Sequence, residues 1–379
     1  MPAVRKALVI GGGIGGLAAA VAMRRVGIAV DLVEIKSDWA VYGVGIIQPN
    51  NTLRALQRIG LAHACVASGA SFPGWHIYNE SEDLLMVAPG SNEALPACPA
   101  FVGITRPKLQ KILTNAALEA GTHACLGVTV EAVDELTWGI RVSFSDGTSG
   151  DYELLVAADG IHSKTRTRLF GEMVVPRFSG QSVWRCNLPR PEEMIWGEVH
   201  YGAGTKVGLV PLSAKLMYMF LVTAEPGNPR MPSEKLDFLM RDRLGDYRGR
   251  LGALRESITD ATAVVYKPME AILLPPPWYK GRQIVIGDAA HATTPHLAQG
   301  AAMAIEDAVL LGELLGSHDV LSGALEEFMR RRFRRAKYVV DSSNQIATWE
   351  LEQWNIVPNP NAKPGELLHE ASLALMAPY

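Results

Sequence analysis

A glycine-rich turn near the start of the chain constrains the fold more than any other feature of the sequence. Gly11, Gly13 and Gly16 follow the pattern GxGxxG, between the apolar stretch Lys6–Ile10 and the alanine-rich stretch Leu17–Val26. This order predicts a strand, a tight turn and a helix, and the first glycine permits the turn. The second glycine lets a phosphate group approach the helix N-terminus, and the third lets the helix pack closely on the strand.

A second apolar stretch, Ala29–Ile35, completes this unit and contains Glu34 near its end. A carboxylate at this place can accept hydrogen bonds from both hydroxyls of a ribose and would repel a 2′-phosphate. A strand, turn, helix and strand within about 30 residues form the βαβ element of a doubly wound fold with a parallel sheet. We therefore expect an α/β protein that begins with a Rossmann-like dinucleotide-binding unit.

The rest of the chain shows two patterns. Short apolar strands and one proline-free helix are expected to return to the first lobe, at Val128–Val133, Ile140–Phe144, Tyr152–Ala157, Gln283–Ile286 and Gly300–Leu315. By contrast, Lys206–Val222 is rich in strand-forming residues, is interrupted at Pro211–Lys215, and predicts an antiparallel sheet with one covered face. The nucleotide-binding lobe is thus expected to be discontinuous in sequence, with a separate substrate lobe.

These patterns suggest approximate domain boundaries. We place the nucleotide-binding lobe at residues 1–75, 101–178 and 273–345. The substrate lobe is placed at residues 179–272, with an insertion at 76–100, and a C-terminal tail at 346–379 follows a helical region. Before the tail, five arginines on one predicted helix are expected to form a solvated face, namely Arg330, Arg331, Arg332, Arg334 and Arg335.

Composition and charge argue against several classes of protein. A formal net charge of −3 gives no broad basic surface of the kind that binds nucleic acid. The four cysteines are far apart and form no CxxC pair, so neither a metal site nor a disulfide framework is expected. The apolar stretch Ala7–Met23 is interrupted by glycines and followed by arginines, which fits neither a signal peptide nor stable membrane insertion. The expected location is the cytoplasm.

Three sequence signatures occur in a fixed order along the chain. They are GGGIGG with Glu34, the segment LLVAADGIHSKTR with Asp159 and Gly160, and GDAAHATTPHLAQGAAMAIEDA over Gly287–Ala308. In this order the chain resembles the FAD-dependent aromatic hydroxylases related to para-hydroxybenzoate hydroxylase, which are single-component flavoprotein monooxygenases. The resemblance extends to urate, 6-hydroxynicotinate, salicylate and alkylquinolone hydroxylases.

The resemblance implies a set of contacts with FAD. The glycine turn and Glu34 would hold the ADP half, with Val130 near the adenine, and Asp288 would meet the ribitol. Asp159 would support both FAD and the nicotinamide cofactor. The full set of expected FAD-binding residues is Gly11, Gly13, Ile14, Gly15, Gly16, Glu34, Arg106, Val130, Asp159, Asp288, Gly300, Ala301 and Ala302.

The same resemblance implies a reaction. Reduced flavin would react with dioxygen to give a C4a-hydroperoxide, whose distal oxygen passes to an electron-rich ring of a small aromatic or N-heteroaromatic substrate. No second GxGxxG is present, so NAD(P)H is expected to bind transiently and without a domain of its own. The protein would provide binding, orientation and exclusion of water. The chain is expected to be a monomer or a homodimer.

Three residues are candidates for activating the substrate. His296 lies by resemblance at the flavin edge, where salicylate and 6-hydroxynicotinate hydroxylases also place a histidine, and it is the candidate base. Lys206 and Tyr218 match an arginine and a tyrosine of urate hydroxylases, and their spacing could bring both toward one pocket. Each has a structural alternative: a loop-ordering histidine, a solvated lysine and a core tyrosine. His291 is expected to be structural.

The resemblance leaves the substrate open. Urate hydroxylases carry an aspartate where His296 stands, and lysine lacks the planar fork of their arginine. The histidine that 6-hydroxynicotinate hydroxylases place after the second strand falls on Ile47, and alkylquinolone hydroxylases share a pair like Trp184-Arg185. Two other functions remain: an FAD-dependent oxidase, dehydrogenase or epoxidase acting on a non-aromatic substrate, and a non-catalytic flavin-binding protein.

Overall fold

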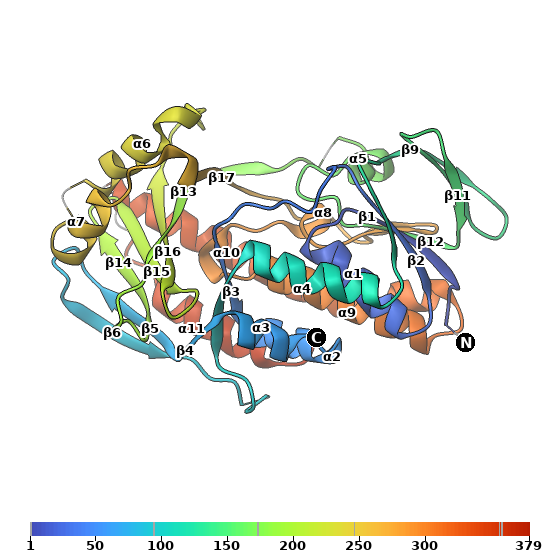
Figure 1. Cartoon of the computed structure of the whole chain (residues 1–379), viewed down its shortest axis with the longest axis horizontal. Coiled ribbons are helices and arrows are strands. Elements are labelled where there is room, and N and C mark those ends of the chain that lie inside the picture. Colours follow the sequence, from blue (N-terminus) through green and yellow to red (C-terminus); the bar gives the residue numbers. More distant parts are fainter. Residues whose placement is uncertain (1, 94, 173, 246, 356, 358) are drawn as a thin grey trace.

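Two lobes and a long C-terminal helix make up the structure (Figure 1). The computed structural model describes residues 2–93, 95–172, 174–245, 247–355, 357 and 359–379. One lobe contains a mainly parallel sheet, and the other contains a larger, mainly antiparallel sheet. The α/β fold predicted from the sequence is therefore confirmed.

A six-stranded sheet forms the centre of the first lobe, in the order β18-β19-β12-β1-β2-β8. Its strands are parallel except for β18, which pairs with β19 in antiparallel orientation. The strand bounds are β1 (Lys6–Ile10), β2 (Ala29–Glu34), β8 (His123–Leu126), β12 (Leu154–Ala157), β18 (Tyr279–Lys280) and β19 (Gln283–Val285). β1, β12 and β19 are almost wholly buried, as expected of parallel strands covered on both faces.

Helices and small sheets cover this central sheet. α1 (Ile14–Arg25) packs against both α9 (Gly300–Ser317) and α4 (Arg106–Glu119). A Cβ atom at Gly312 of α9 would lie 2.7 Å from that of Ala22, so small residues let α9 pack closely on α1. The remaining elements of this lobe are β3 (Gly45–Pro49), α2 (Asn50–Arg58), α3 (Ala62–Ser68), β4 (Ala70–Phe72), β7 (Phe101–Thr105), β9 (Val130–Glu135), β10 (Ile140–Phe144), β11 (Ser149–Tyr152), α5 (Lys164–Phe170), α8 (Asp288–His291) and η3 (Pro295–Leu297).

A seven-stranded sheet forms the second lobe, in the order β17-β13-β16-β15-β14-β5-β6. Only β14 and β5 pair in parallel. The bounds are β5 (Gly74–Tyr78), β6 (Leu84–Pro89), β13 (Arg177–Pro189), β14 (Gly197–Gly202), β15 (Thr205–Pro211), β16 (Leu216–Ala224) and β17 (Val265–Ala271). One face packs in an apolar cluster with η1 (Ser233–Lys235), α6 (Leu236–Leu244), α7 (Gly249–Glu256) and η2 (Ala261–Ala263), while the other face borders the first lobe.

The C-terminal region consists of α10 (Leu321–Trp354) and α11 (Pro364–Met376). α10 packs against α9, β13 and α11, and therefore contacts both lobes. The predicted solvated arginine face on α10 is only partly right. Arg330 and Arg334 are exposed, but Arg332 is 0% exposed and Arg335 is half-buried. Arg332 and Arg335 are three residues apart, so they share the helix face that contacts α9.

Several predicted elements differ from the structure at their ends. β1 and β10 have the predicted bounds, but α1 begins at Ile14 because the last glycines of the turn take helical positions. The predicted strand Tyr152–Ala157 is divided between β11 and β12, which belong to different sheets. A change of sheet within a continuous apolar run leaves no mark in hydrophobic periodicity.

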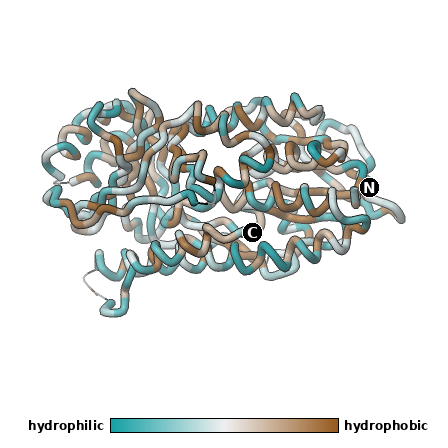
Figure 2. Tube along the Cα trace, turned by 90° about the horizontal axis from the view of Figure 1, so that it is seen from below, coloured by the Kyte–Doolittle hydropathy of each residue, from teal (hydrophilic) through white to brown (hydrophobic). Residues whose placement is uncertain are grey.

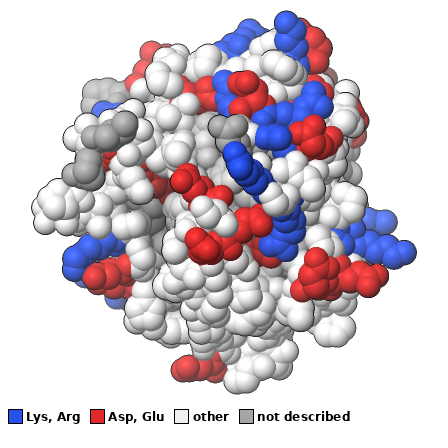
Figure 3. All heavy atoms as spheres, turned by 90° about the vertical axis from the view of Figure 1, so that its left-hand side faces the viewer, with Lys and Arg blue, Asp and Glu red and all other residues white. Residues whose placement is uncertain are grey.

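Apolar and charged residues are distributed differently between the interior and the surface. Apolar segments run through the interior of both lobes, and hydrophilic segments predominate along the outer rim (Figure 2). The end of the second lobe that carries α6, α7 and β6 shows acidic and basic side chains interspersed, without a broad basic area (Figure 3). Within the described part of the chain, no helix is long and apolar enough to cross a membrane.

Candidate active site

The glycine turn has the geometry that its sequence predicts. Gly11 has φ +102°, a conformation that side chains rarely allow, and a Cβ atom at Gly16 would collide with the carbonyl oxygen of Gly11. A Cβ atom at Gly13 would meet no protein atom within 4 Å. The space before the N-terminus of α1 is therefore open to a ligand, as a bound phosphate requires.

Glu34 lies at the end of β2 and faces this turn. Its Oε2 accepts from the backbone N–H of Gly12 at 2.6 Å, and its Oε1 accepts from that of Lys36 at 3.0 Å. Gln110 of α4 donates to the carbonyl of Gly12 at 2.6 Å. The carboxylate thus stabilises the turn itself, a role that the sequence pattern did not distinguish from contact with a ribose. Val130 begins β9 and is half-buried.

Asp159 organises the turn between β12 and α5. Its Oδ1 accepts from the hydroxyl of Ser163 at 2.5 Å, and its Oδ2 accepts from the N–H of Thr165 at 3.1 Å. Arg166 then donates from Nη1 to the carbonyl of Ala289 at 3.0 Å, which joins this turn to α8. The block around Asp159 is therefore connected to the segment that carries Asp288.

Asp288 and Arg106 are charged groups close enough to affect each other's pKa. The side chain of Asp288 is exposed, and desolvation by the surrounding protein raises its pKa. Arg106 is half-buried, and burial lowers its pKa below the ordinary value of an arginine. Within the described residues neither charged group has a hydrogen-bond partner. Charged groups held inside a protein without partners are typical of a site for a polar ligand.

The first turn of α9 borders the predicted flavin site. Gly300 and Ala301 are half-buried, Ala302 is buried, and the helix has no acidic residue in its first turn. Gln299 precedes the helix and is bonded to Asn51 of α2, with Nδ2 of Asn51 donating to its Oε1 at 2.9 Å. The N-terminal amides of α9 are thus held in a fixed position by α2.

The second lobe contributes two further polar groups close to Arg106. Arg185 on β13 is half-buried, and burial lowers its pKa to about 10, with Arg106 adding to this effect. Tyr218 on β16 is 5% exposed, and burial raises its pKa against the effect of Arg185 and Arg106. Neither the guanidinium of Arg185 nor the hydroxyl of Tyr218 has a hydrogen-bond partner among the described residues. In the sequence, Arg185 stands out only as part of the pair Trp184-Arg185, and its position beside Tyr218 is not evident.

Lys206 lies on the same face of the sheet as Tyr218, as the predicted spacing requires, but it is already paired. Its Nζ forms an ion pair with Oε1 of Glu350, a residue of α10 that is 5% exposed. Gln181 of β13 donates to Oε2 of Glu350 at 3.0 Å. Glu350 was not predicted, because its partner on β15 is 144 residues away in the sequence.

The side chain of His296 is buried behind the loop that precedes α9, with 1% of it exposed. Its Nε2 lies 3.2 Å from Oε2 of Glu350, and its Nδ1 lies 3.0 Å from the hydroxyl of Thr294. Burial lowers the pKa of His296, and nearby Lys206 lowers it further. The structure therefore brings two of the three predicted candidates, His296 and Lys206, together on one carboxylate that the sequence did not reveal.

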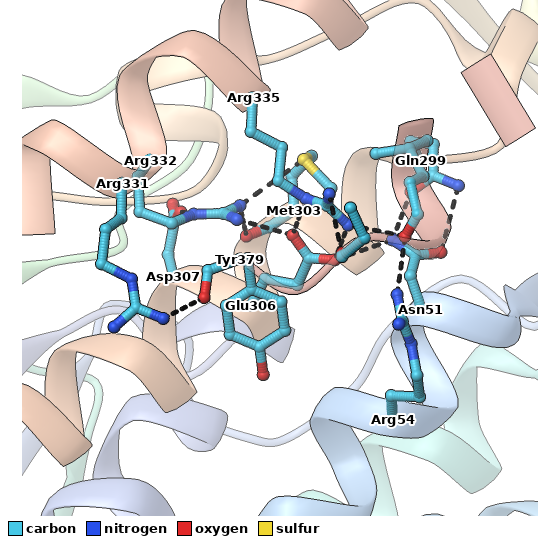
Figure 4. Close-up of polar contacts among 12 residues, drawn as sticks. Asn51, Arg54, Gln299, Met303, Glu306, Asp307, Arg331, Arg332, Arg335 and Tyr379 are labelled. Atoms are coloured by element: carbon cyan, nitrogen blue, oxygen red, sulfur yellow. Dashed lines mark hydrogen bonds and ion pairs between the residues drawn. The ribbon is translucent and has the colours of Figure 1, made fainter. Parts of the chain in front are cut away.

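A second buried network lies behind α9 and explains His291. Its Nε2 contacts Oδ2 of Asp307 at 2.6 Å, and the N–H of Gly287 donates to the same oxygen at 2.9 Å. Arg332 donates to Asp307 at 2.7 Å and to Glu306 at 2.6 Å (Figure 4). His291 thus belongs to a buried hydrogen-bonded network that includes Asp307 and Arg332. No group of three or more potential metal ligands occurs among the described residues.

The geometry fits FAD, because the glycine turn and the residue before Asp288 both lie against α9: Cβ atoms at Gly15 and Gly287 would come within 3.3 Å and 3.0 Å of that of Ala304. Comparison with known proteins agrees: the model of a family described as FAD binding domain matches residues 5–343. The chain belongs to this FAD-binding family. Its similarity to a monooxygenase and to a quinolone synthase assigns it to the FAD-dependent monooxygenases of the aromatic hydroxylase type.

Two curated relatives and one solved structure illustrate the range of this FAD-binding family. The aurachin C monooxygenase/isomerase of Stigmatella aurantiaca is 31% identical over 90% of this chain and 90% of its own. The 2-heptyl-3-hydroxy-4(1H)-quinolone synthase of Pseudomonas aeruginosa is 33% identical over 81% and 80%. The structure of HpxO from Klebsiella pneumoniae with FAD and uric acid has a TM-score of 0.85 at 23% identity, over 98% of this chain and 96% of that one.

Proposed function

We propose that this protein hydroxylates a small phenolic, aromatic-acid or N-heteroaromatic substrate, using NAD(P)H and dioxygen. FAD, when bound, supplies electron transfer from the nicotinamide and activation of dioxygen. The chain's own residues bind the substrate ring, orient it and exclude water. Arg185 carries this proposal, because it offers a positive charge that has no hydrogen-bond partner among the described residues and lies close to Arg106 and Tyr218.

A substrate with an ionised or acidic ring fits these groups. Arg185 would balance the charge of a phenolate, carboxylate or deprotonated heterocycle, and such a charge makes the ring more electron-rich. The hydroxyl of Tyr218, which also lacks a protein partner, would donate to the same oxygen. Because oxygen transfer to the ring is electrophilic, stabilising the anion at this place favours the reaction.

Apolar side chains provide the rest of the binding surface. A buried cluster around Tyr218 contains Ile47, Phe72, Val210 and Leu212, and half-buried aromatic residues pack against it. Such walls suit a flat ring and keep water from the reacting atoms. Because this cluster is mainly apolar, we favour a benzo-fused ring such as a quinolone, which one relative's name contains, over the more polar purine ring of the uric acid bound to HpxO.

The proposal is tested by mixing FAD-loaded protein anaerobically with NADH or NADPH and following flavin bleaching by stopped flow. The panel contains salicylate, 6-hydroxynicotinate, 4-hydroxyquinoline, 2-heptyl-4-quinolone and urate. We expect one ring class to accelerate bleaching strongly, and its product to contain one oxygen atom from ¹⁸O₂ by mass spectrometry. If a compound bleaches the flavin without nicotinamide, the protein is an oxidase or dehydrogenase and the proposal is wrong.

A further inference from the structure

Lys206 and His296, which the sequence offered as independent candidates, end on the same buried carboxylate. Glu350 pairs with Lys206 through Oε1 and contacts Nε2 of His296 through Oε2 at 3.2 Å. The three side chains are between 1% and 9% exposed and come from β15, η3 and α10. The arrangement therefore joins the substrate lobe, the loop before α9 and the C-terminal helix.

The single negative charge of Glu350 can balance one positive charge, so only one of Lys206 and His296 needs to be positively charged. The ion pair that Glu350 forms is with Lys206, whose ammonium contacts Oε1 of the carboxylate. The pKa of Glu350 falls to about 2: burial would raise it, but Lys206 and His296 outweigh that effect. A further positive charge on His296 would lie in a buried place beside the ammonium of Lys206.

The groups facing this cluster do not supply a second negative charge. Gln181 of β13 is neutral and donates to Glu350 at 3.0 Å. Tyr201 of β14 is held in its neutral form, because burial and the charge of Glu350 both raise its pKa. Burial lowers the pKa of His296, Lys206 lowers it further, and the opposing effect of Glu350 is smaller. Burial, together with Lys206, thus outweighs the effect of Glu350 on the pKa of His296 and favours the neutral imidazole.

Neutral His296 can adopt only one tautomer in this environment. An ionised carboxylate accepts hydrogen bonds but cannot donate, so Nε2, which faces Glu350, must carry the proton. Nδ1 is then an acceptor, and the hydroxyl of Thr294 donates to it at 3.0 Å. The basic nitrogen of the ring is therefore Nδ1, whose lone pair accepts from Thr294.

We propose that Lys206 and Glu350 are positioning residues whose ion pair keeps His296 a neutral imidazole protonated on Nε2. Lys206 is then paired with Glu350 and does not bind the substrate, whereas Arg185 provides the positive charge that contacts the substrate. A part for this neutral ring in catalysis rests on the proposed function, whereas the protonation state of the ring does not.

The protonation state can be measured directly by ¹⁵N NMR of protein labelled at its histidine nitrogens. The chain has nine histidines, and the variant His296→Asn identifies the signals that belong to His296. At pH 7 we expect one protonated and one unprotonated ring nitrogen with widely separated shifts. An imidazolium signal in the unaltered protein at pH 7 would overturn the proposal.

Variants of Lys206 give the decisive comparison. In Lys206→Met the carboxylate has lost its ammonium, so His296 should take up a proton and its pKa should rise by about one unit or more. Lys206→Arg keeps the positive charge and should keep the ring neutral. The double variant Lys206→Met with Glu350→Gln removes both charges and should also leave the ring neutral. A neutral ring in Lys206→Met alone sinks the proposal.

Two further measurements keep the test interpretable. If Lys206→Met fails to fold by circular dichroism, Glu350→Gln provides the test, because loss of the carboxylate should lower the pKa of His296 further. An unchanged or raised pKa there contradicts the proposal. Product formation is measured separately: if the NMR results are as expected but no ring compound is hydroxylated, the proposed function fails and the inference stands.

Discussion

At the scale of single residues, buried charges in this protein fall into two groups. Arg332, Glu306 and Asp307 form a closed network in which each charged group has a partner. Arg185 and Arg106, both half-buried, have no side-chain hydrogen-bond partner among the described residues. An unpaired charge inside a protein costs several kcal/mol, which is tolerated where a ligand later supplies the partner. The charged residues without partners therefore mark the candidate ligand site, whereas the paired charged residues stabilise the fold.

Replacing Arg185 by Met should weaken substrate binding and stabilise the empty protein. Loss of the guanidinium removes the partner of an anionic ring, so the Kd for salicylate should rise by about 10- to 100-fold. The FAD-free protein should gain about 1 kcal/mol in unfolding free energy, because a desolvated, unpaired charge has been replaced by an apolar side chain. Flavin absorbance titration and thermal melts measure the two effects.

Arg177→Met is the matched control, because Arg177 lies on the same strand and is exposed. Both quantities should stay unchanged in this variant, within about 0.5 kcal/mol. Equal salicylate affinity in the unaltered protein and Arg185→Met would contradict the role of Arg185 in substrate binding.

Asp307 should make stability depend on acid pH. Burial would raise its pKa, but His291 and Arg332 outweigh that effect and lower it to about 2. Because the unfolded value is about 3.9, the contribution is complete above pH 4 and is lost as pH falls through 2, with a size of about 2–3 kcal/mol. In Asp307→Asn, the urea midpoint of the FAD-free protein should fall less between pH 5 and pH 2.

The unaltered protein should lose stability more steeply than Asp307→Asn over this range, although Glu350 adds a similar contribution to both. Asp134→Asn, at an exposed position on β9, serves as the control and should keep the full slope. Identical slopes in Asp307→Asn and the unaltered protein would show that the buried network does not set the acid response.

At the scale of elements, local patterns were predicted well and long-range partners were not. β1 and β10 have their predicted bounds, since each is a short apolar strand next to a glycine signal. The burial of Arg332 was missed, because a run of charges does not reveal which helix face meets a neighbour. A signal was present: Glu306 and Asp307 interrupt the apolar first half of α9, and buried acidic residues need cationic partners. Glu350 carried no such signal.

The glycine turn yields a prediction with a built-in comparison. In Gly16→Ala the new Cβ atom collides with the carbonyl of Gly11, so the turn cannot form and FAD should be lost on purification. In Gly13→Ala the new methyl group meets no protein atom, so the protein should fold normally. Its methyl group would intrude on a bound phosphate, and FAD affinity should fall by about 10-fold. Full FAD content in Gly16→Ala would contradict this account.

At the scale of the whole molecule, the C-terminal region connects the surface to the flavin site. Arg54 of α2 and Arg335 of α10 both donate to the carbonyl of Leu375, at 2.6 Å and 2.9 Å. Tyr379 is 7% exposed, and its ring lies 5.5 Å from the guanidinium carbon of Arg332. Figure 4 shows Arg332 and Arg335 pointing at Glu306, which also accepts from Asn51, the partner of Gln299.

Removing residues 363–379 should therefore lower both thermal stability and FAD affinity. Three arginines would lose backbone acceptors around Glu306, and Leu375 would leave an apolar cluster that includes Ala302 at the start of α9. We expect the melting temperature to fall by several degrees, as a loss of about 2–4 kcal/mol implies for a chain of this size. Release of FAD, followed by its fluorescence on heating, should precede loss of tryptophan fluorescence, because the loop before α9 loosens first.

A chain that ends at Ala377 is the graded control for this deletion. It lacks only Pro378 and Tyr379, keeps α11 with its carbonyl contacts to Arg54 and Arg335, and should lose a smaller part of the stability. FAD release and unfolding at one temperature in the longer deletion would mean that the tail stabilises the fold as a whole. Earlier FAD release in that deletion alone would show that α11 acts on the flavin site through α2, because Asn51 is the described residue that joins Gln299 to Glu306.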